Sequence, residues 1–304
     1  SATQDITIDA LRIEQIKESE KNLLAAGAAV SVVGWWTGYK IGGLVSLLSA
    51  DILQKQGVEN YWQISFLILS GIITVCSIGL LFVPEKDSKE KINSQNIADK
   101  KILDKIGVSN QFTKGFAWLY GTIVNPLLSF FKKNTISVAL SILGFVFLFK
   151  IGEAFLGRMS LVFYKEIGFS KTDIALYSKG IGWITTVTFT LLGGLFAVRM
   201  GLVKAMFLSG VFMALTNILF SVLAWVGNSE ILFAFTVLID DLAAAFATVA
   251  FVGFISALVD RNYTATQYAL LASIGTLGRT LFASSSGMMV DWLNGNWIIF
   301  FIIT

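Results

Sequence analysis

Residues 202–226 read LVKAMFLSGVFMALTNILFSVLAWV, and after a short polar break residues 231–259 read ILFAFTVLIDDLAAAFATVAFVGFISALV. A helix that crosses the hydrocarbon core of a bilayer needs about 20 predominantly apolar residues. Both runs exceed that length, and their few charged residues are Lys204, Asp240 and Asp241. The two runs therefore predict two consecutive membrane-spanning helices.

Apolar runs of the same kind recur along the rest of the chain. They cover residues 22–50, 61–83, 134–155, 177–198 and 264–290, with a cut run at 297–304. Residues 2–11 are typical of the tail of an earlier span. The pattern predicts an all-α polytopic membrane protein with about eight spans, the last of them incomplete.

The composition supports this class and excludes others. Hydrophobic residues make up 55% of the chain and charged residues 14%, with a mean hydropathy of +0.73. A soluble domain carries roughly 25% charged residues. The chain has no histidine and a single cysteine, Cys76, which excludes histidine-based zinc sites and Ser-His-Asp or Cys-His catalysis. A net charge of +3 is too small to indicate nucleic-acid binding, and we expect no enzyme activity, metal or cofactor.

Residues 85–133 differ in kind, because they hold nine lysines against five acidic residues. Such a segment is typical of a polar linker between two membrane halves, and six spans follow it, as in the second half of a 6+6 transporter. We therefore expect residues 1–84 to be the end of span 4 with spans 5 and 6, and residues 134–304 to be spans 7–12. The first half would then lack roughly three and a half spans.

The distribution of cations predicts the orientation of the helices. With the linker in the cytoplasm, cytoplasmic segments hold fifteen lysines and arginines and the opposite segments hold four, as the positive-inside rule requires. At the end of the linker, aromatic and aliphatic residues recur every three or four positions from Phe112 to Phe131. This stretch can form an amphipathic helix on the cytoplasmic membrane face, or serve only as the lead-in to the next span.

Asp5 and Asp9 are the first of several charged residues inside the predicted spans, where a central charge costs about 2.5–3.5 kcal/mol. They stand four residues apart and so share one helix face. Burial and a neighbouring like charge both favour the protonated form of a carboxyl group, so the pair can couple transport to protons. Alternatively, Asp9 lies in interfacial water and only Asp5 is deep.

The remaining membrane charges occur on four other predicted spans. Lys150 and Glu153 stand three residues apart near the outer end of their span, as a local ion pair or as substrate contacts. The adjacent residues Asp240 and Asp241 must point about 100° apart on a helix, so they cannot face one cavity equally. Lys40 and Arg279 occupy matching positions of the two halves, where cations suit an anionic substrate or neutralise the aspartates.

Several motifs resemble known families. GLFAVRMG at residues 194–201 is similar to the short cytoplasmic signature of the major facilitators, with Val198 in place of its aspartate. ATQDI at 2–6, YKIG at 39–42, NP with FFKKN at 125–134, KIGEA at 150–154, and TATQYALL with Gly278-Arg279 in the 264–290 run resemble the AmpG-type muropeptide permeases. This resemblance runs from Ala2 to the end of the chain.

The resemblance implies a proton-coupled importer of peptidoglycan fragments. The cargo would be N-acetylglucosaminyl-1,6-anhydro-N-acetylmuramic acid, with or without peptide, and the place the bacterial inner membrane. It makes Gln4 and Asp5 the first candidates for substrate contact and proton coupling, followed by Lys40, Lys150, Glu153, Asp240 and Arg279. Three residues depart from the family pattern: Lys40 replaces an arginine, Glu153 an aspartate, and Asp241 an amide.

Other interpretations stay open at this stage. The partners implied are a small solute, protons and the lipid bilayer, and we expect a monomer that binds no nucleic acid. Related acetyl-coenzyme A carriers share the early glutamine-aspartate element, so the solute can be another amphiphilic anion. The missing spans also fit a non-functional gene remnant.

Overall fold

The computed structural model describes residues 2–83, 118–170 and 182–304, together with residues 93, 97, 174 and 177. These residues form helices and connecting turns, and no β-strand occurs among them. Most of the predicted linker and its aromatic start at Phe112 lie outside the described residues. The protein is thus the all-α, multi-pass membrane protein that the sequence predicts.

Most helices fall on the predicted apolar runs, whereas the helix Asn125–Lys133 lies at the end of the predicted linker. Before the linker they are α1 (Ala2–Gln15), α2 (Leu23–Lys55) and α3 (Tyr61–Leu80). After it follow α6 (Asn125–Lys133), α7 (Ile136–Leu148), α8 (Ile151–Ile167), α10 (Gly182–Met200), α11 (Leu202–Val226), α12 (Glu230–Leu258), α13 (Thr264–Ser284), α14 (Ser286–Trp292) and α15 (Trp297–Ile303). Among the described residues, five helical segments are long and apolar enough to cross a membrane: Tyr61–Leu80, Ile136–Ile167, Trp183–Met200, Leu202–Val226 and Glu230–Leu258.

One predicted span was placed wrongly. The run assigned to residues 134–155 continues as helix to Ile167, with a break at Phe149 and Lys150 between α7 and α8. Arg158 and Lys165 lower the hydropathy of the second part, which hid its continuation from the sequence pattern. Lys150 and Glu153 therefore lie near the middle of a 32-residue helical segment and not at its outer end.

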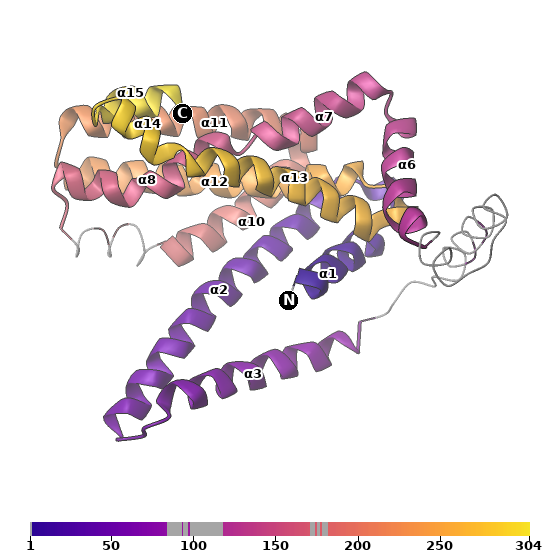
Figure 1. Ribbon diagram of the computed structural model, residues 1–304, viewed down its shortest axis with the longest axis horizontal. Helices are drawn as coiled ribbons and strands as arrows, with labels where there is room; N and C mark the ends of the chain where they lie inside the picture. Colours follow the sequence, from indigo (N-terminus) through magenta and orange to yellow (C-terminus); the bar gives the residue numbers. More distant parts are fainter. Residues whose placement is uncertain are drawn as a thin grey trace.

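Helices α7, α8 and α10–α15 pack into one elongated bundle (Figure 1). One group of buried aromatic side chains, including Phe163, Phe220 and Phe301, joins α8, α11 and α15 near one end of this bundle. We call this end the far end. The opposite end carries the α10–α11 and α12–α13 turns together with α6, and we call it the linker end. Helix α6 lies across the bundle axis there (Figure 1).

Helices α1 and α2 pack against the bundle near the linker end. A Cβ on Gly194 of α10 would lie 2.5 Å from the Cβ of Ala29 in α2, and a Cβ on Gly253 of α12 would lie 3.4 Å from the Cα of Ala25. The two glycines thus let the backbones approach closely, as small residues do in membrane helices.

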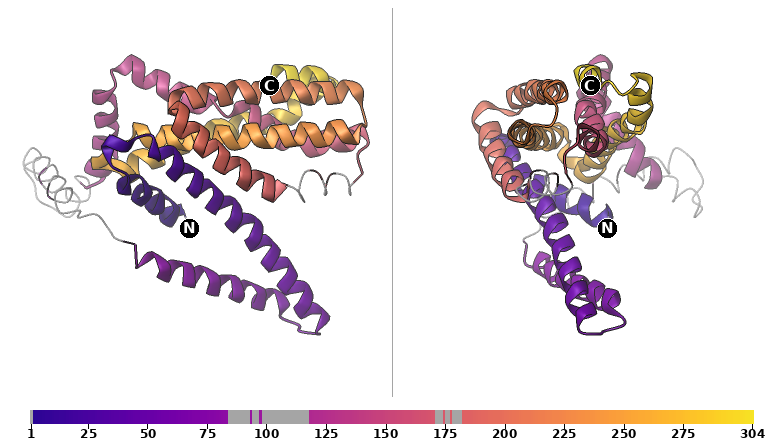
Figure 2. Two further views of the ribbon diagram at one scale, coloured as in Figure 1. Left: turned by 180° about the vertical axis from the view of Figure 1, so that it is seen from behind. Right: turned by 90° about the vertical axis from the view of Figure 1, so that its left-hand side faces the viewer.

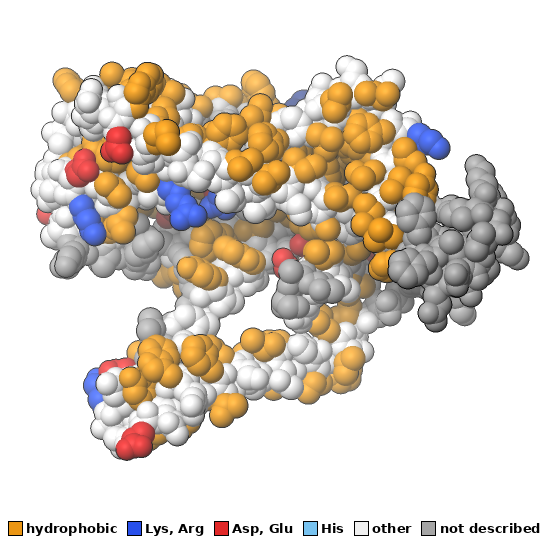
Figure 3. Space-filling view, in the orientation of Figure 1, with side chains coloured by type: hydrophobic (Ala, Val, Ile, Leu, Met, Phe, Trp, Pro, Cys, Tyr) orange, Lys and Arg blue, Asp and Glu red, His pale blue; other side chains and the backbone are white. Residues whose placement is uncertain are grey.

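Away from this contact, α2 and α3 diverge from the bundle toward the far end (Figures 1 and 2). Only 6% of the α3 span is buried, and apolar side chains such as Phe66, Leu67 and Val75 are exposed along it. Hydrophobic side chains also spread over the visible faces of α3 and of the bundle (Figure 3). Such surfaces are typical of helices that face lipid or further helices.

Candidate functional site

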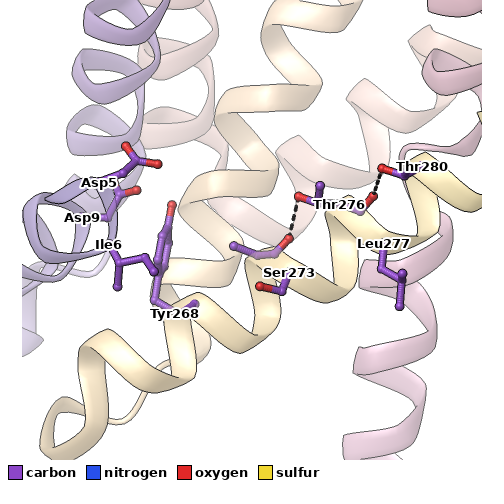
Figure 4. A pocket seen from close by; sticks show the side chains of 10 residues that line it. Asp5, Ile6, Asp9, Tyr268, Ser273, Thr276, Leu277 and Thr280 are labelled. Atoms are coloured by element: carbon purple, nitrogen blue, oxygen red, sulfur yellow. Dashed lines mark hydrogen bonds between the residues drawn. The ribbon is translucent and has the colours of Figure 1, made fainter. Parts of the chain in front are cut away.

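A cavity of about 530 Å³ lies between α1 and α13, where the two predicted halves face each other. The carboxylates of Asp5 and Asp9 reach it from α1, and Tyr268 stands opposite them on α13 (Figure 4). Further along α13 the lining is formed by Ala269, Ala272, Ser273, Thr276, Leu277 and Thr280. The i,i+4 spacing of the two aspartates thus places both on the cavity face, as their shared helix face predicts.

Asp9 is held by an ion pair within α1. The Nε and Nη2 atoms of Arg12 lie 3.1 and 3.0 Å from Oδ1 of Asp9, and both side chains are nearly buried. The hydroxyl of Ser31, from α2, donates to the same oxygen at 3.3 Å. Tyr268 faces this pair from α13. Asp9 therefore lies in a nearly buried polar cluster at the edge of the cavity.

The same arginine connects α1 to α12. Nη2 of Arg12 donates to the hydroxyl of Ser256 in α12 at 3.1 Å, and that hydroxyl donates to the Val252 carbonyl at 2.7 Å. Ser256 is 2% exposed. This hydrogen bond stabilises the contact between α1 and α12 at the linker end, because separation would remove the Ser256 partner from a nearly buried guanidinium.

Asp5 differs from Asp9, because it is exposed to the cavity and no described side chain pairs with it. On the facing wall, Thr276 and Thr280 donate their hydroxyl protons to the carbonyls of Ala272 and Thr276, at 2.9 and 2.8 Å (Figure 4). Each hydroxyl oxygen keeps lone pairs that can accept hydrogen bonds. The lining is mostly apolar, and its polar part, formed by Asp5 and hydroxyl oxygens such as those of Thr276 and Thr280, can accept hydrogen bonds from O–H and N–H donors of a solute.

A second cluster of charges lies inside the bundle at the break between α7 and α8. Nζ of Lys150 donates to Oε2 of Glu153 at 2.6 Å and to the hydroxyl of Thr248 in α12 at 2.7 Å. Nη2 of Arg279 lies 4.0 Å from the other oxygen of Glu153. The Lys150 side chain is 11% exposed, whereas that of Arg279 is 53% exposed. Glu153 thus joins one buried and one accessible cation.

The close packing of α13 on α7 explains how Arg279 reaches this cluster. A Cβ on Gly278 would fall 2.0 Å from the carbonyl oxygen of Phe147, and one on Gly275 would fall 2.8 Å from Cζ of Phe251. At Gly278 only a residue without a side chain fits, because the neighbour is backbone, and Gly278 brings the backbone of α13 against the end of α7. The next residue, Arg279, then lies within reach of Glu153.

The adjacent aspartates of α12 turn to different neighbours, as their 100° separation requires. Oδ1 of Asp240 accepts from Thr216 of α11 at 3.0 Å, and Oδ2 of Asp241 accepts from Thr185 of α10 at 3.1 Å. Glu153 lies within electrostatic reach of Asp240. Asp241 instead lines a separate cavity of about 210 Å³ between α10 and α12.

The structure thus brings the predicted residues together in two groups. Asp5 and Asp9 share the cavity, and Lys150, Glu153, Asp240 and Arg279 gather at the helix break. Gln4 is exposed on α1 but does not line that cavity, and the side chain of Lys40 lies outside what the structure describes. In the described part of the chain, no three His, Cys, Asp or Glu side chains are placed to share a metal ion.

Sequence reasoning missed the partners of these charges. Arg12 is one of the fifteen cations that the sequence assigns to the cytoplasmic side, and its i,i+3 spacing from Asp9 signals the ion pair that the structure shows. Thr276 and Thr280 follow a helical period through the 264–290 run, which was a usable signal. Tyr268 and Thr248 gave no such signal, because their role arises from contacts between distant helices.

Comparison with known proteins agrees with this architecture. The family model of the Major Facilitator Superfamily matches residues 19–283, and the chain belongs to this superfamily of membrane transporters. Within it the chain is similar to AmpG-type transporters.

Three relatives illustrate the similarity. A Rickettsia felis protein that carries the name transporter AmpG 4 is 32% identical over 310 residues, which cover all of this chain and 66% of the relative. The transporter named AmpG 3 of Rickettsia typhi is 28% identical, over 99% of this chain and 65% of its own length. The anhydromuropeptide permease of Escherichia coli (strain K12) is 27% identical, and the match covers 96% of this chain and 52% of that permease. The chain therefore spans between half and two thirds of the length of these relatives.

Proposed function

We propose that this protein is a proton-coupled secondary transporter that imports anhydro-muropeptides from the periplasm into the cytoplasm. The cargo is N-acetylglucosaminyl-1,6-anhydro-N-acetylmuramic acid, with or without its peptide, and the location is the bacterial inner membrane. The observation that carries the proposal is the cavity between α1 and α13, which holds an unpaired carboxylate facing a wall of hydroxyl groups. The similarity to the Escherichia coli permease supports the choice of cargo.

The chemistry of the cavity fits a sugar with hydroxyl and amide groups. Asp5 and the oxygens of Ser273, Thr276 and Thr280 accept hydrogen bonds from such donors. Gln4 adds an amide at the exposed end of α1. Trp35 is 57% exposed and stacks on Tyr39 with ring centroids 5.7 Å apart, so α2 offers an aromatic surface for a sugar ring. Trp36 and Trp183 extend the set of candidate aromatic contacts.

The carboxylates of the muramyl unit or of the peptide need positively charged side chains as binding partners. Arg279 is the best candidate, because it is half exposed and 4.0 Å from Glu153, a distance at which the ion pair is weak. Lys150 is committed to Glu153 and Thr248 by short hydrogen bonds and would keep Glu153 in place. Lys40 is the matching cation on α2. Asp240 balances the charge of this group from α12.

We assign proton coupling first to Asp5 and second to Asp9. Asp9 already neutralises Arg12, so protonation there would break a nearly buried ion pair. Asp5 has no described partner, and its protonation removes a charge from the cavity without breaking another contact. A change of charge at this place shifts the balance between two conformations only if they expose Asp5 differently. Rocking of the two halves about the cavity provides that difference.

The test is uptake of radiolabelled anhydro-disaccharide by the full-length protein in proteoliposomes under an imposed proton gradient. We expect Asp5→Asn to abolish gradient-driven accumulation while exchange of labelled for unlabelled cargo continues. Asp51→Asn is the matched control, because Asp51 forms an exposed pair with Lys55 outside the cavity. If Asp5→Asn still accumulates the disaccharide fully, Asp5 is not the coupling residue. If acetyl-coenzyme A inhibits uptake and muropeptides do not, the cargo is a different amphiphilic anion and the proposed cargo is wrong.

A further inference from the structure

Helix α6 and the helical turn before it lie at the linker end, outside the proposed transport cavity. Residues 118–134 read WLYGTIVNPLLSFFKKN, a stretch with two lysines and no acidic residue. Helix α6 lies across the bundle axis, whereas the long helices of the bundle run along it (Figures 1 and 2). When the bundle crosses a membrane, α6 is therefore close to parallel to the membrane plane.

One side of α6 is packed on the bundle. Pro126 and Phe130 are buried, and their four-residue spacing places them on one helix face. The hydroxyl of Ser129 donates to Oδ2 of Asp260, in the turn after α12, at 2.8 Å. Nε2 of Gln267 in α13 donates to the Pro126 carbonyl at 2.9 Å, and Gln267 is only 3% exposed. These contacts fix the rotation of α6 about its own axis.

A different side of α6 is apolar and exposed. Leu127 and Leu128 are 38% and 42% exposed, and the partly buried Phe131 lies between them on the helix surface. At about 100° per residue, these three side chains cover an arc of about 100°. Lys132 follows about 40° beyond Leu128 and is exposed, as is Lys133. The helix thus has three sides: one packed on the bundle, one apolar and exposed, and one polar.

The apolar side of α6 continues into a surface that faces lipid. Helix α7 begins at Ile136, directly after the turn that ends α6, and the segment Ile136–Ile167 is long and apolar enough to cross a membrane. At its start Ile136, Val138 and Leu140 are 68%, 50% and 57% exposed. Hydrophobic side chains also gather over α6 at the linker end (Figure 3). Helix α6 therefore lies at the level where the membrane begins, and the lipid around α7 also reaches α6.

We propose that α6 is an interfacial helix whose partner is the lipid surface of the membrane at the linker end. Leu127, Leu128 and Phe131 enter the boundary between headgroups and acyl chains, where such helices bury their apolar side about 5–10 Å deep. Lys132 and Lys133 extend toward the lipid phosphates, since a lysine can bury its carbon chain and keep its ammonium group in water. The apolar side provides the binding, and the lack of acidic residues avoids repulsion by the phosphates.

This location connects the membrane surface with the wall of the transport cavity. Oε1 of Gln267 accepts from the Asp260 amide at 2.6 Å, so one buried side chain joins α6 to the α12–α13 turn. The next residue, Tyr268, lines the cavity. A helix held in the membrane surface therefore fixes the depth at which the linker end of α13 lies.

The test measures membrane depth by electron paramagnetic resonance of nitroxide labels on the full-length protein in liposomes of phosphatidylglycerol and phosphatidylethanolamine. Native cysteines are replaced by Ser, and single labelling sites are created by Leu128→Cys, Lys132→Cys, Val138→Cys and Lys55→Cys. A label in lipid collides more often with molecular oxygen, which concentrates in hydrocarbon, than with a water-soluble nickel chelate. Val138 on α7 is the lipid-facing reference, and Lys55 in the exposed pair at the end of α2 is the aqueous reference.

We expect the ratio of oxygen to nickel collisions at Leu128→Cys to match that at Val138→Cys and to exceed that at Lys132→Cys. A ratio as low as that at Lys55→Cys would show that this side of α6 faces water, and the proposal would be wrong. Low collision rates with both reagents at Leu128→Cys would show that another protein segment or a second copy covers α6, which overturns it equally. The measurement uses no cargo and no proton gradient, so its outcome does not depend on the proposed transport function.

Discussion

The ion pair between Lys150 and Glu153 offers the most quantitative test of the charges inside the bundle. Replacing Lys150 by Met keeps the length of the side chain but removes the ammonium group 2.6 Å from Glu153 and 2.7 Å from Thr248. Breaking a buried ion pair by removing one partner costs about 3–5 kcal/mol, because the other charge stays buried and unpaired.

Two features of the cluster reduce this cost. The Glu153 side chain is 22% exposed, and Arg279 remains 4.0 Å from its other oxygen. We therefore expect Lys150→Met to lower the free energy of unfolding by about 2–3 kcal/mol. For a chain of this size, that loss corresponds to a decrease in Tm of about 4–6 °C.

The assay is thermal unfolding of the purified protein in detergent, with the double variant Lys150→Met/Glu153→Gln as the decisive comparison. Once Glu153 is also neutral, no unpaired charge remains, and most of the lost stability should return. Lys55→Met is the control, because its pair with Asp51 is exposed and should contribute no more than about 1 kcal/mol. The reasoning is refuted if Lys150→Met is as stable as the wild type, or if the double variant is no more stable than the single one.

Further predictions concern the close helix contacts and the contact between the halves. Gly278→Ala should destabilise the protein by about 1–3 kcal/mol through overpacking against Phe147, whereas Gly287→Ala, which meets open space, should leave the Tm within about 2 °C. Gly194→Leu should force α2 away from α10, which would appear as faster hydrogen exchange at the start of α2 and unchanged exchange in α15. Arg12→Met should leave Asp9 and Ser256 without their shared partner and lower the Tm by more than Lys204→Met does, and equal Tm values would show that Arg12 does not hold the halves together.

Much of the fold was predictable, because membrane helices are long, apolar and separated by polar turns. The 202–226 run coincides with α11, and the 231–259 run is within one residue of α12 at each end. The prediction failed at the α7–α8 segment, where charged residues beyond Lys150 lie in a helix that continues past them. One of these residues, Glu166, accepts a hydrogen bond from Trp297 at 2.7 Å, and a hydropathy pattern contains no information about such partners.

The candidate site was predictable only in part. From the sequence, Asp5, Asp9, Glu153 and Arg279 are candidate functional residues, because a charged side chain inside a membrane span is energetically costly. The sequence could not show that Arg279 approaches Glu153, because this contact depends on the packing of Gly278 against α7, 125 residues or more away in the chain. Long-range contacts of this kind arise from the bundle as a whole and not from local periodicity.

The proposed transport mechanism depends most on water reaching the cavity between α1 and α13 that Asp5 and Thr276 line. Because α1 and α2 pack on the bundle near the linker end, which the distribution of cations predicts to be cytoplasmic, we expect this water to enter from the opposite side. Cysteine accessibility tests it most directly, with the native Cys76 replaced by Ser and a membrane-impermeant maleimide added from each side of the membrane in turn. We expect Thr276→Cys to react rapidly from the periplasmic side and slowly from the cytoplasmic side, and Ala205→Cys, which is fully buried, to remain unmodified. If Thr276→Cys is as inert as Ala205→Cys from both sides, no aqueous chamber borders α13 and the account is contradicted.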